Sequence, residues 1–144
     1  MQPNPDAPLC LCIELDADFF YLVRSYAERG GLRAEPVSRG TDAVDQAKMT
    51  KPAVIFLEID RPTQQRSWDV LAALKSEQAV KDIPVVVFSW LEEEEVAIQK
   101  GADVFVRKPV MFSDFLDVLI SFGLCTGANS NEIFIKKEVS RKNN

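Results

Sequence analysis

Three apolar segments of this sequence lead to side chains that can do chemistry. Segment 53–57 is followed by Glu58, segment 85–88 is followed by Ser89, and Lys108 comes shortly after a third segment. A carboxylate can act as a nucleophile or a cation ligand, and hydroxyl and ammonium groups can bond to an anion. Apolar runs of this kind often end in a reactive aspartate. Glu58 is therefore a working site, a disabled one or an ordinary strand end.

The surrounding sequence predicts the elements that must position these side chains. Five short apolar runs alternate with segments of helical periodicity, which indicates an α/β fold: a five-stranded parallel sheet with helices on both faces. Sites in such sheets form beyond the carboxyl ends of the strands. We therefore expect Glu58, Ser89 and Lys108 to meet at one edge of the sheet, together with residues 14–16. The five predicted strands are 9–13, 33–37, 53–57, 85–88 and 103–106.

Capping residues and apolar periodicity set the limits of the helices between these strands. Five helices are predicted. The first is capped by Asp16 or Asp18 and ends at Gly30-Gly31, and the second runs from its N-cap Thr41 to Met49. The third includes residues 68–74 and the fourth spans 92–101. The last helix is capped by Ser113.

Composition narrows the classes of function. The 144 residues suit one domain, and 47% of them are hydrophobic, enough for a core. The formal net charge of −5 argues against a general nucleic-acid surface. The absence of histidine removes the commonest general base and transition-metal ligand. We interpret the three cysteines, Cys10, Cys12 and Cys125, as buried thiols in a reducing cytosol.

The expected organisation is a short N-terminal lead over 1–8, a folded domain over 9–123 and a tail over 124–144. The tail reads either as a linker stub or as an added strand. No apolar run reaches the roughly 18 residues that a membrane span needs. The N-terminus lacks the charged and apolar regions of a signal peptide. The predicted location is therefore the cytoplasm.

The order of elements and three motifs resemble the receiver domain of bacterial two-component response regulators, the CheY-like family with a flavodoxin-like fold. Segment 51–62 is similar to the acceptor strand and loop of that family, and 84–89 to its hydroxyl-bearing strand. Gly-Ala-Asp-Val-Phe-Val-Arg-Lys-Pro at 101–109 is similar to its last strand. The resemblance covers residues 9–122 and implies a place in two-component signalling or a phosphorelay, and not an enzyme.

Receivers of this family take a phosphoryl group onto an aspartate, and the resemblance assigns a position to each part of that chemistry. An acidic pair after the first strand, at Glu14 and Leu15 here, would hold a divalent cation. Ser89 and Lys108 stand where a hydroxyl and an ammonium group bond to the phosphoryl oxygens. The resemblance also implies a cis peptide bond between Lys108 and Pro109.

Two positions depart from the family pattern. The register set by Pro62 places Glu58 at the acceptor position, and its extra methylene moves the carboxylate by about an ångström, which can cost on the order of a hundredfold in rate. Leu15 cannot bind a cation, and Asp16 stands one residue late. We interpret the pocket as a degenerate phosphoacceptor site with no metal expected. A cation held by Glu14 and Asp16 is the weaker alternative.

A glutamate at the acceptor position reaches towards the place where acyl-phosphate oxygens would lie. Glu58 can pair with Lys108 or accept a hydrogen bond from Ser89. Such a contact either holds the domain in one permanent state or simply stabilises the fold as an ion pair. The sequence leaves both interpretations open.

Three further residues bear on the expected switch and output surface. Trp90 stands where the family usually has a small residue, and we interpret it as packing, with a pocket lid or a partner anchor as alternatives. Phe105 matches the aromatic that family members move between inward and outward positions, coupled to Ser89. Pro109 lies on the same surface. The segment from Ser89 to Lys108 is shorter than the resemblance implies.

The leading prediction is a phosphorylation-independent receiver, or pseudo-receiver: a protein–protein interaction module without a cofactor. Its expected partners are signalling proteins that dock on the face formed by the fourth helix, fifth strand and fifth helix. A homodimer would use the same face, and neither nucleic acid nor a membrane is an expected partner. Basic residues of the tail, Lys136 and Lys137 among them, are interpreted as solvated, with an acidic partner as the alternative.

Two other functions stay open. An atypical receiver would still be phosphorylated on Glu58 or Asp60, with Mg²⁺ held by Glu14 and Asp16. A small flavodoxin-like cofactor binder is the second alternative. Because no Gly-rich phosphate loop follows the first strand, the sequence argues against it.

Overall fold

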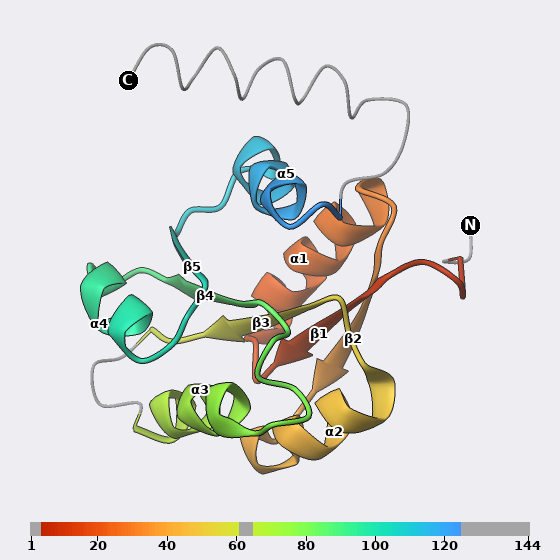
Figure 1. Ribbon diagram of the computed structural model, residues 1–144. Helices are drawn as coiled ribbons and strands as arrows, with labels where there is room; N and C mark the ends of the chain where they lie inside the picture. The colour runs from red at the N-terminus through yellow and green to blue at the C-terminus, as the bar shows by residue number, and fades with distance from the viewer. Residues whose placement is uncertain (1–3, 61–64, 125–144) are drawn as a thin grey trace.

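A five-stranded parallel sheet organises the computed structural model, which describes residues 4–60 and 65–124. The spatial order of the strands is β2-β1-β3-β4-β5, so β2 and β5 form the two edges (Figure 1). The predicted fold class is therefore confirmed. The strands are β1 (Leu9–Ile13), β2 (Arg33–Val37), β3 (Val54–Glu58), β4 (Val85–Ser89) and β5 (Val104–Arg107).

Helices connect successive strands and cover both faces of the sheet (Figure 1). One apolar cluster joins α1 and α5 to one face, and a second joins α2, α3 and α4 to the other. Two-sided cover explains why β1, β3 and β4 are continuous apolar runs. The helices are α1 (Ala17–Arg29), α2 (Ala43–Thr50), α3 (Gln65–Ser76), α4 (Glu94–Gln99) and α5 (Phe112–Ser121), with a 3-10 turn η1 (Gly40–Asp42) before α2.

The cysteines of β1 belong to the core. Cys10 and Cys12 are fully buried in the cluster under α1 and α5, which confirms their interpretation as buried thiols. Burial raises the pKa of Cys10 to about 12 and that of Cys12 well above its ordinary value, so neither is a ready nucleophile. Cys125 lies outside the described residues.

The boundaries of several elements differ from the predicted ones. Glu58 and Ser89 are the last residues of β3 and β4 rather than loop residues, and both are buried. Thr41 does not cap α2, because it lies inside η1 and α2 starts at Ala43. Ser113 lies within the first turn of α5 and is not its N-cap. In each case another residue, Asp42 or Met111, occupies the N-cap position. Helix ends are therefore hard to predict from sequence to within one or two residues.

The cap of α1 is as predicted, and it bears on the site. Asp16 is the N-cap: its side chain accepts a hydrogen bond from the backbone N–H of Asp18 at 3.2 Å. The helix ends at Gly30, and Gly31 follows with a positive φ of 87°.

The predicted tail, including its alternative as an added strand, lies outside the described residues from position 125 onwards. In the described part of the chain, no helix has the length and apolar character to cross a membrane.

Candidate functional site

The carboxyl ends of β3, β4 and β5 bring the predicted site residues together. Glu58 pairs in register with Phe88, the neighbour of Ser89, and Ser89 pairs with Arg107, the neighbour of Lys108. The backbone N–H of Lys108 donates to the carbonyl of Ser89 at 2.8 Å. Parallel pairing in this register therefore places a carboxylate, a hydroxyl and an ammonium group at one edge of the sheet, as the strand order predicts.

Lys108 lies at the centre of this edge. Its residue is only 7% exposed, and its Nζ donates to Glu58 Oε2 and, at 2.7 Å, to Asp60 Oδ2. The ammonium group also lies 4.3 Å from the ring centroid of Phe19 and 5.8 Å from that of Trp90. Two carboxylates and two aromatic rings therefore surround one buried cation. The Lys108–Pro109 peptide bond that carries it into the site is cis, as the resemblance implies.

Glu58 is held from two sides. Its residue is 6% exposed, and Oε1 accepts a hydrogen bond from the backbone N–H of Asp16 at 2.7 Å while Oε2 accepts from Lys108. Burial raises the pKa of Glu58 above its ordinary value, the hydrogen bonds from Asp16 and Lys108 oppose the rise, and the charge of Asp60 adds to it. Of the two partners that the sequence suggested for Glu58, the structure selects Lys108.

A raised pKa at Glu58 predicts a specific pH dependence of stability. Between the ordinary value of 4.5 and the raised value, the folded chain binds a proton that the unfolded chain has lost. The free energy of unfolding contributed by this group is therefore highest below pH 4.5 and declines as pH rises through the raised pKa. We expect the stability of the wild type relative to Glu58→Gln to fall over this window, as measured by urea unfolding at several pH values. A constant difference would show that the pKa of Glu58 is ordinary.

Ser89 makes a different contact from the expected one. Its hydroxyl oxygen accepts a hydrogen bond from the backbone N–H of Leu91 at 2.9 Å, and the residue is 1% exposed. This local turn fixes the start of the segment between β4 and α4. Ser89 thus shares the edge with Glu58 and Lys108, but its hydroxyl supports the loop.

The side chains of Glu14 and Asp16 make separate contacts and do not face a common cation position. Glu14 has a positive φ of 52°, and its Oε1 accepts from the backbone N–H of Gly40 at 2.7 Å and pairs with Arg66 at 3.1 Å. The side chain of Asp16 is engaged as the cap of α1. Leu15, between them, is half-buried and packs against the core cluster under α1 and α5.

The magnesium ion implied by the resemblance does not fit these residues. Leu15 offers no oxygen, and Oε1 of Glu14 already accepts a hydrogen bond from Gly40 and pairs with Arg66. The space between Glu58 and Asp60, where a cation would balance the two carboxylates, is filled by the ammonium group of Lys108. Within the described residues, no group of three or more His, Cys, Asp or Glu side chains is arranged to hold a metal ion.

The three residues of the expected output surface differ in their exposure to solvent. The packing interpretation of Trp90 is wrong, because the residue is 56% exposed and its ring stands over the site beside Lys108. Phe105 is half-buried and packs against the core cluster under α2, α3 and α4. Pro109 is exposed.

Sequence reasoning missed Asp60 as a partner of Lys108. Its Oδ2 accepts from Lys108, and its Oδ1 accepts from the backbone N–H of Trp90 at 3.1 Å. The signal was available, since residues two apart in an extended segment point to the same side and Glu58 already faced the site. The contacts of Arg66 and Phe19 carried no such signal, because they depend on how α3 and α1 pack.

Comparison with known proteins agrees with this architecture. No family model matches the chain. The chain is 26% identical over 104 residues to the polar-differentiation response regulator DivK of Brucella anthropi, a match that covers 70% of this chain and 84% of DivK. DivK of Brucella ovis matches at the same identity and coverage.

Solved receiver structures share the fold at lower identity. The chemotaxis protein CheY4 of Vibrio cholerae superposes with a TM-score of 0.70 at 17% identity, covering 81% of this chain and 98% of that one. The receiver domain of a Pseudomonas aeruginosa sensor histidine kinase, whose active-site cleft coordinates a magnesium ion, gives 0.69 at 15% identity, covering 81% and 97%. Sequence and fold together show that this chain is similar to response regulators of two-component signalling and has the fold of CheY-like receiver domains, from which its sequence diverges.

Proposed function

We propose that this receiver works without phosphorylation, as a protein-binding module whose acceptor pocket is closed by its own side chains. The observation that carries the proposal is the buried contact of Lys108 with Glu58 and Asp60. An ammonium group between these carboxylates compensates their charge where a divalent cation would be needed for phosphoryl transfer. The contact therefore replaces the cation with part of the chain itself.

The position of Glu58 supports the same conclusion. A carboxylate that attacks a phosphorylated donor needs a free oxygen and an open approach. Both oxygens of Glu58 accept hydrogen bonds, one from Asp16 and one from Lys108, and the residue is 6% exposed. Displacing either contact would leave a buried group unpaired, which is costly.

The second candidate, a receiver that is still phosphorylated, rests on Asp60. The side chain of Asp60 is 31% exposed, against 7% for Glu58, so a donor would reach it more easily. Lys108 already contacts it at 2.7 Å and could bond to a phosphoryl oxygen there. The proposal must therefore be tested on both carboxylates.

Incubation with acetyl phosphate and magnesium is the direct test. We expect intact-mass spectrometry to show the unmodified mass, while a standard receiver labelled in parallel gains a phosphoryl group. A stoichiometric, magnesium-dependent adduct would overturn the proposal. Glu58→Gln and Asp60→Asn would then identify the acceptor by which of them abolishes labelling.

Without phosphorylation, partner proteins would bind a surface that is already present in the unmodified protein. We propose that partners, as signalling proteins, dock on the face formed by α4, β5 and α5, and that this face also permits a homodimer. Trp90 adds an exposed aromatic ring beside the pocket, a residue type that often anchors protein interfaces. The cytoplasm is the compartment consistent with such partners.

A further inference from the structure

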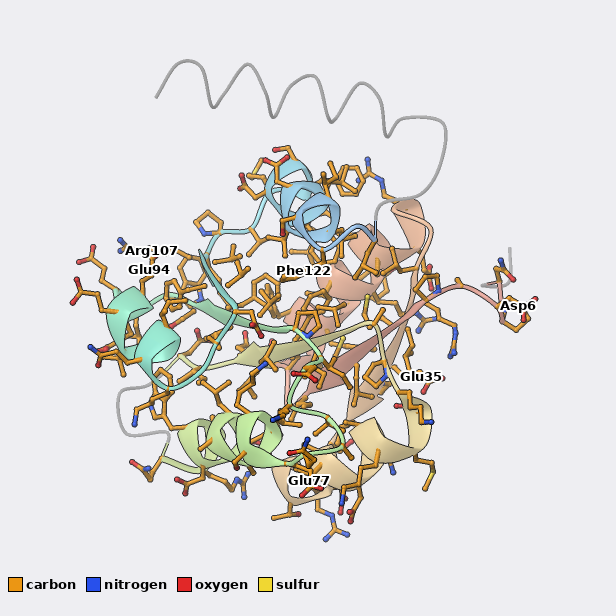
Figure 2. All side chains as sticks on the ribbon, viewed as in Figure 1. Asp6, Glu35, Glu77, Glu94, Arg107 and Phe122 are labelled. Atoms are coloured by element: carbon orange, nitrogen blue, oxygen red, sulfur yellow. The ribbon has the colours of Figure 1, made fainter. Side chains whose placement is uncertain are left out.

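A groove lined mainly by glutamates, with two half-buried apolar side chains as its floor, lies between α4 and β5. It has a volume of about 440 Å³, and its lining consists of the four glutamates Glu92–Glu95 together with Val96, Phe105 and Arg107. Figure 2 shows Glu94 of α4 and Arg107 of β5 on the same side of the molecule. The groove lies apart from the acceptor pocket, because neither Glu58 nor Lys108 contributes to its lining.

The charge of the groove is poorly balanced by its surroundings. Glu92 pairs with Arg107 at 2.6 Å, and both side chains are largely exposed. Within the described ranges 4–60 and 65–124, no cation forms an ion pair with Glu93, Glu94 or Glu95. Adjacent like charges repel, so a basic ligand lying along them would be stabilised.

The floor of the groove offers apolar contact and an open strand edge. Phe105 and Val96 are half-buried and form part of the packing against the core cluster. Phe105 belongs to β5, which is the last strand of the described sheet. An extended segment lying along β5 would therefore meet apolar side chains and unpaired backbone groups together.

The chain itself contains a segment with the complementary chemistry. Residues 132–137 read Glu-Ile-Phe-Ile-Lys-Lys, an apolar run of high strand propensity that ends in two lysines. In an extended conformation, side chains two positions apart lie on one side. Phe134 can then face the apolar floor while Lys136 faces the glutamates, and no other sequence within 125–144 combines these two features.

The connection is long enough for this segment to reach the groove. Leu124, the last described residue, follows α5, which starts near the end of β5 and spans roughly 15 Å. Adding about 10 Å for the lateral distance between packed elements gives a path of roughly 25 Å. The residues from Leu124 to Ile133 can span at most about 30 Å.

We infer that segment 132–137 binds intramolecularly in the groove between α4 and β5, with Phe134 over Phe105 and Val96 and with Lys136 beside Glu93–Glu95. A tethered segment has an effective concentration on the order of 1 mM, so an affinity of about 0.1 mM suffices for roughly tenfold occupancy over the open state. The segment covers part of the proposed docking face, and a partner must displace it. The inference holds whether or not Glu58 is a working acceptor.

Amide hydrogen exchange on the full chain tests this binding. The test variant is Lys136→Glu with Lys137→Glu, and the matched control is Arg141→Glu with Lys142→Glu, which makes the same charge change in the same tail. Exchange of the peptide covering β5 is expected to be about tenfold faster in the test variant than in the wild type. The control variant is expected to exchange at the wild-type rate.

A charge swap adds a second readout, and three outcomes would overturn the inference. Combining Glu93→Lys and Glu94→Lys with the test variant is expected to restore slow exchange at β5. Equal exchange in all variants would mean that the segment does not bind there. Equal acceleration in test and control would mean a general effect of charge, and protection that grows with protein concentration would mean that a second copy fills the groove.

Discussion

Replacing Lys108 with methionine is expected to lower the free energy of unfolding by about 3–5 kcal/mol at pH 7, the cost of leaving a buried charge without its partner. Glu58 would keep its hydrogen bond from Asp16 but lose the cation that compensates its charge, and Asp60 would lose the same partner. Methionine preserves most of the length and apolar character of the lysine stem. Urea unfolding at constant pH measures the change.

Two companion variants make this expectation specific. Lys48→Met removes an exposed ion pair with Glu77 at 3.2 Å and is expected to cost less than about 1 kcal/mol. Lys108→Met combined with Glu58→Leu removes the buried charge as well as its partner, and we expect it to recover most of the lost stability. If Lys108→Met cost no more than Lys48→Met, the ammonium group would not be the cation that closes the pocket.

Restoring the family's residues at two positions is expected to create magnesium binding. Leu15→Asp supplies the missing carboxylate, and Glu58→Asp shortens the side chain that now reaches Lys108. Glu14 can join them, because its pair with the 74% exposed Arg66 is weak and easily given up. We expect a gain of at least about tenfold in magnesium affinity over the wild type. Fluorescence is a suitable measurement, since the exposed ring of Trp90 lies over the site.

The control for this experiment separates charge from packing. Leu15→Asn with Glu58→Asn introduces side chains of the same size as the two aspartates but without their carboxylates. Leu15 is half-buried against the core, so both double variants lose similar packing energy. Magnesium affinity that rises in neither variant would mean that Lys108 still occupies the cation position after Glu58 is shortened. An equal rise in both would mean that the new carboxylates are not the magnesium ligands.

The sequence by itself determined the fold of this chain to within a residue or two at most strand ends. Continuous apolar runs such as β1, β3 and β4 are readable because a two-sided parallel sheet buries every residue of its strands. Spacing also located Glu58, Ser89 and Lys108, since strand ends of a parallel sheet share one edge. Helix starts were less certain, because Asp42 and Met111 replaced the predicted caps Thr41 and Ser113.

What only the tertiary structure decided is which groups contact one another at that edge. Glu58 had two candidate partners in sequence, and the approach of β5 beside β4 selected Lys108. The same packing brought Asp60 to the other side of the ammonium group and turned Glu14 towards Gly40 and Arg66. Sequence spacing fixes which face a side chain points to. The choice among partners on that face depends on distances of an ångström or less, which are set by how strands and helices pack.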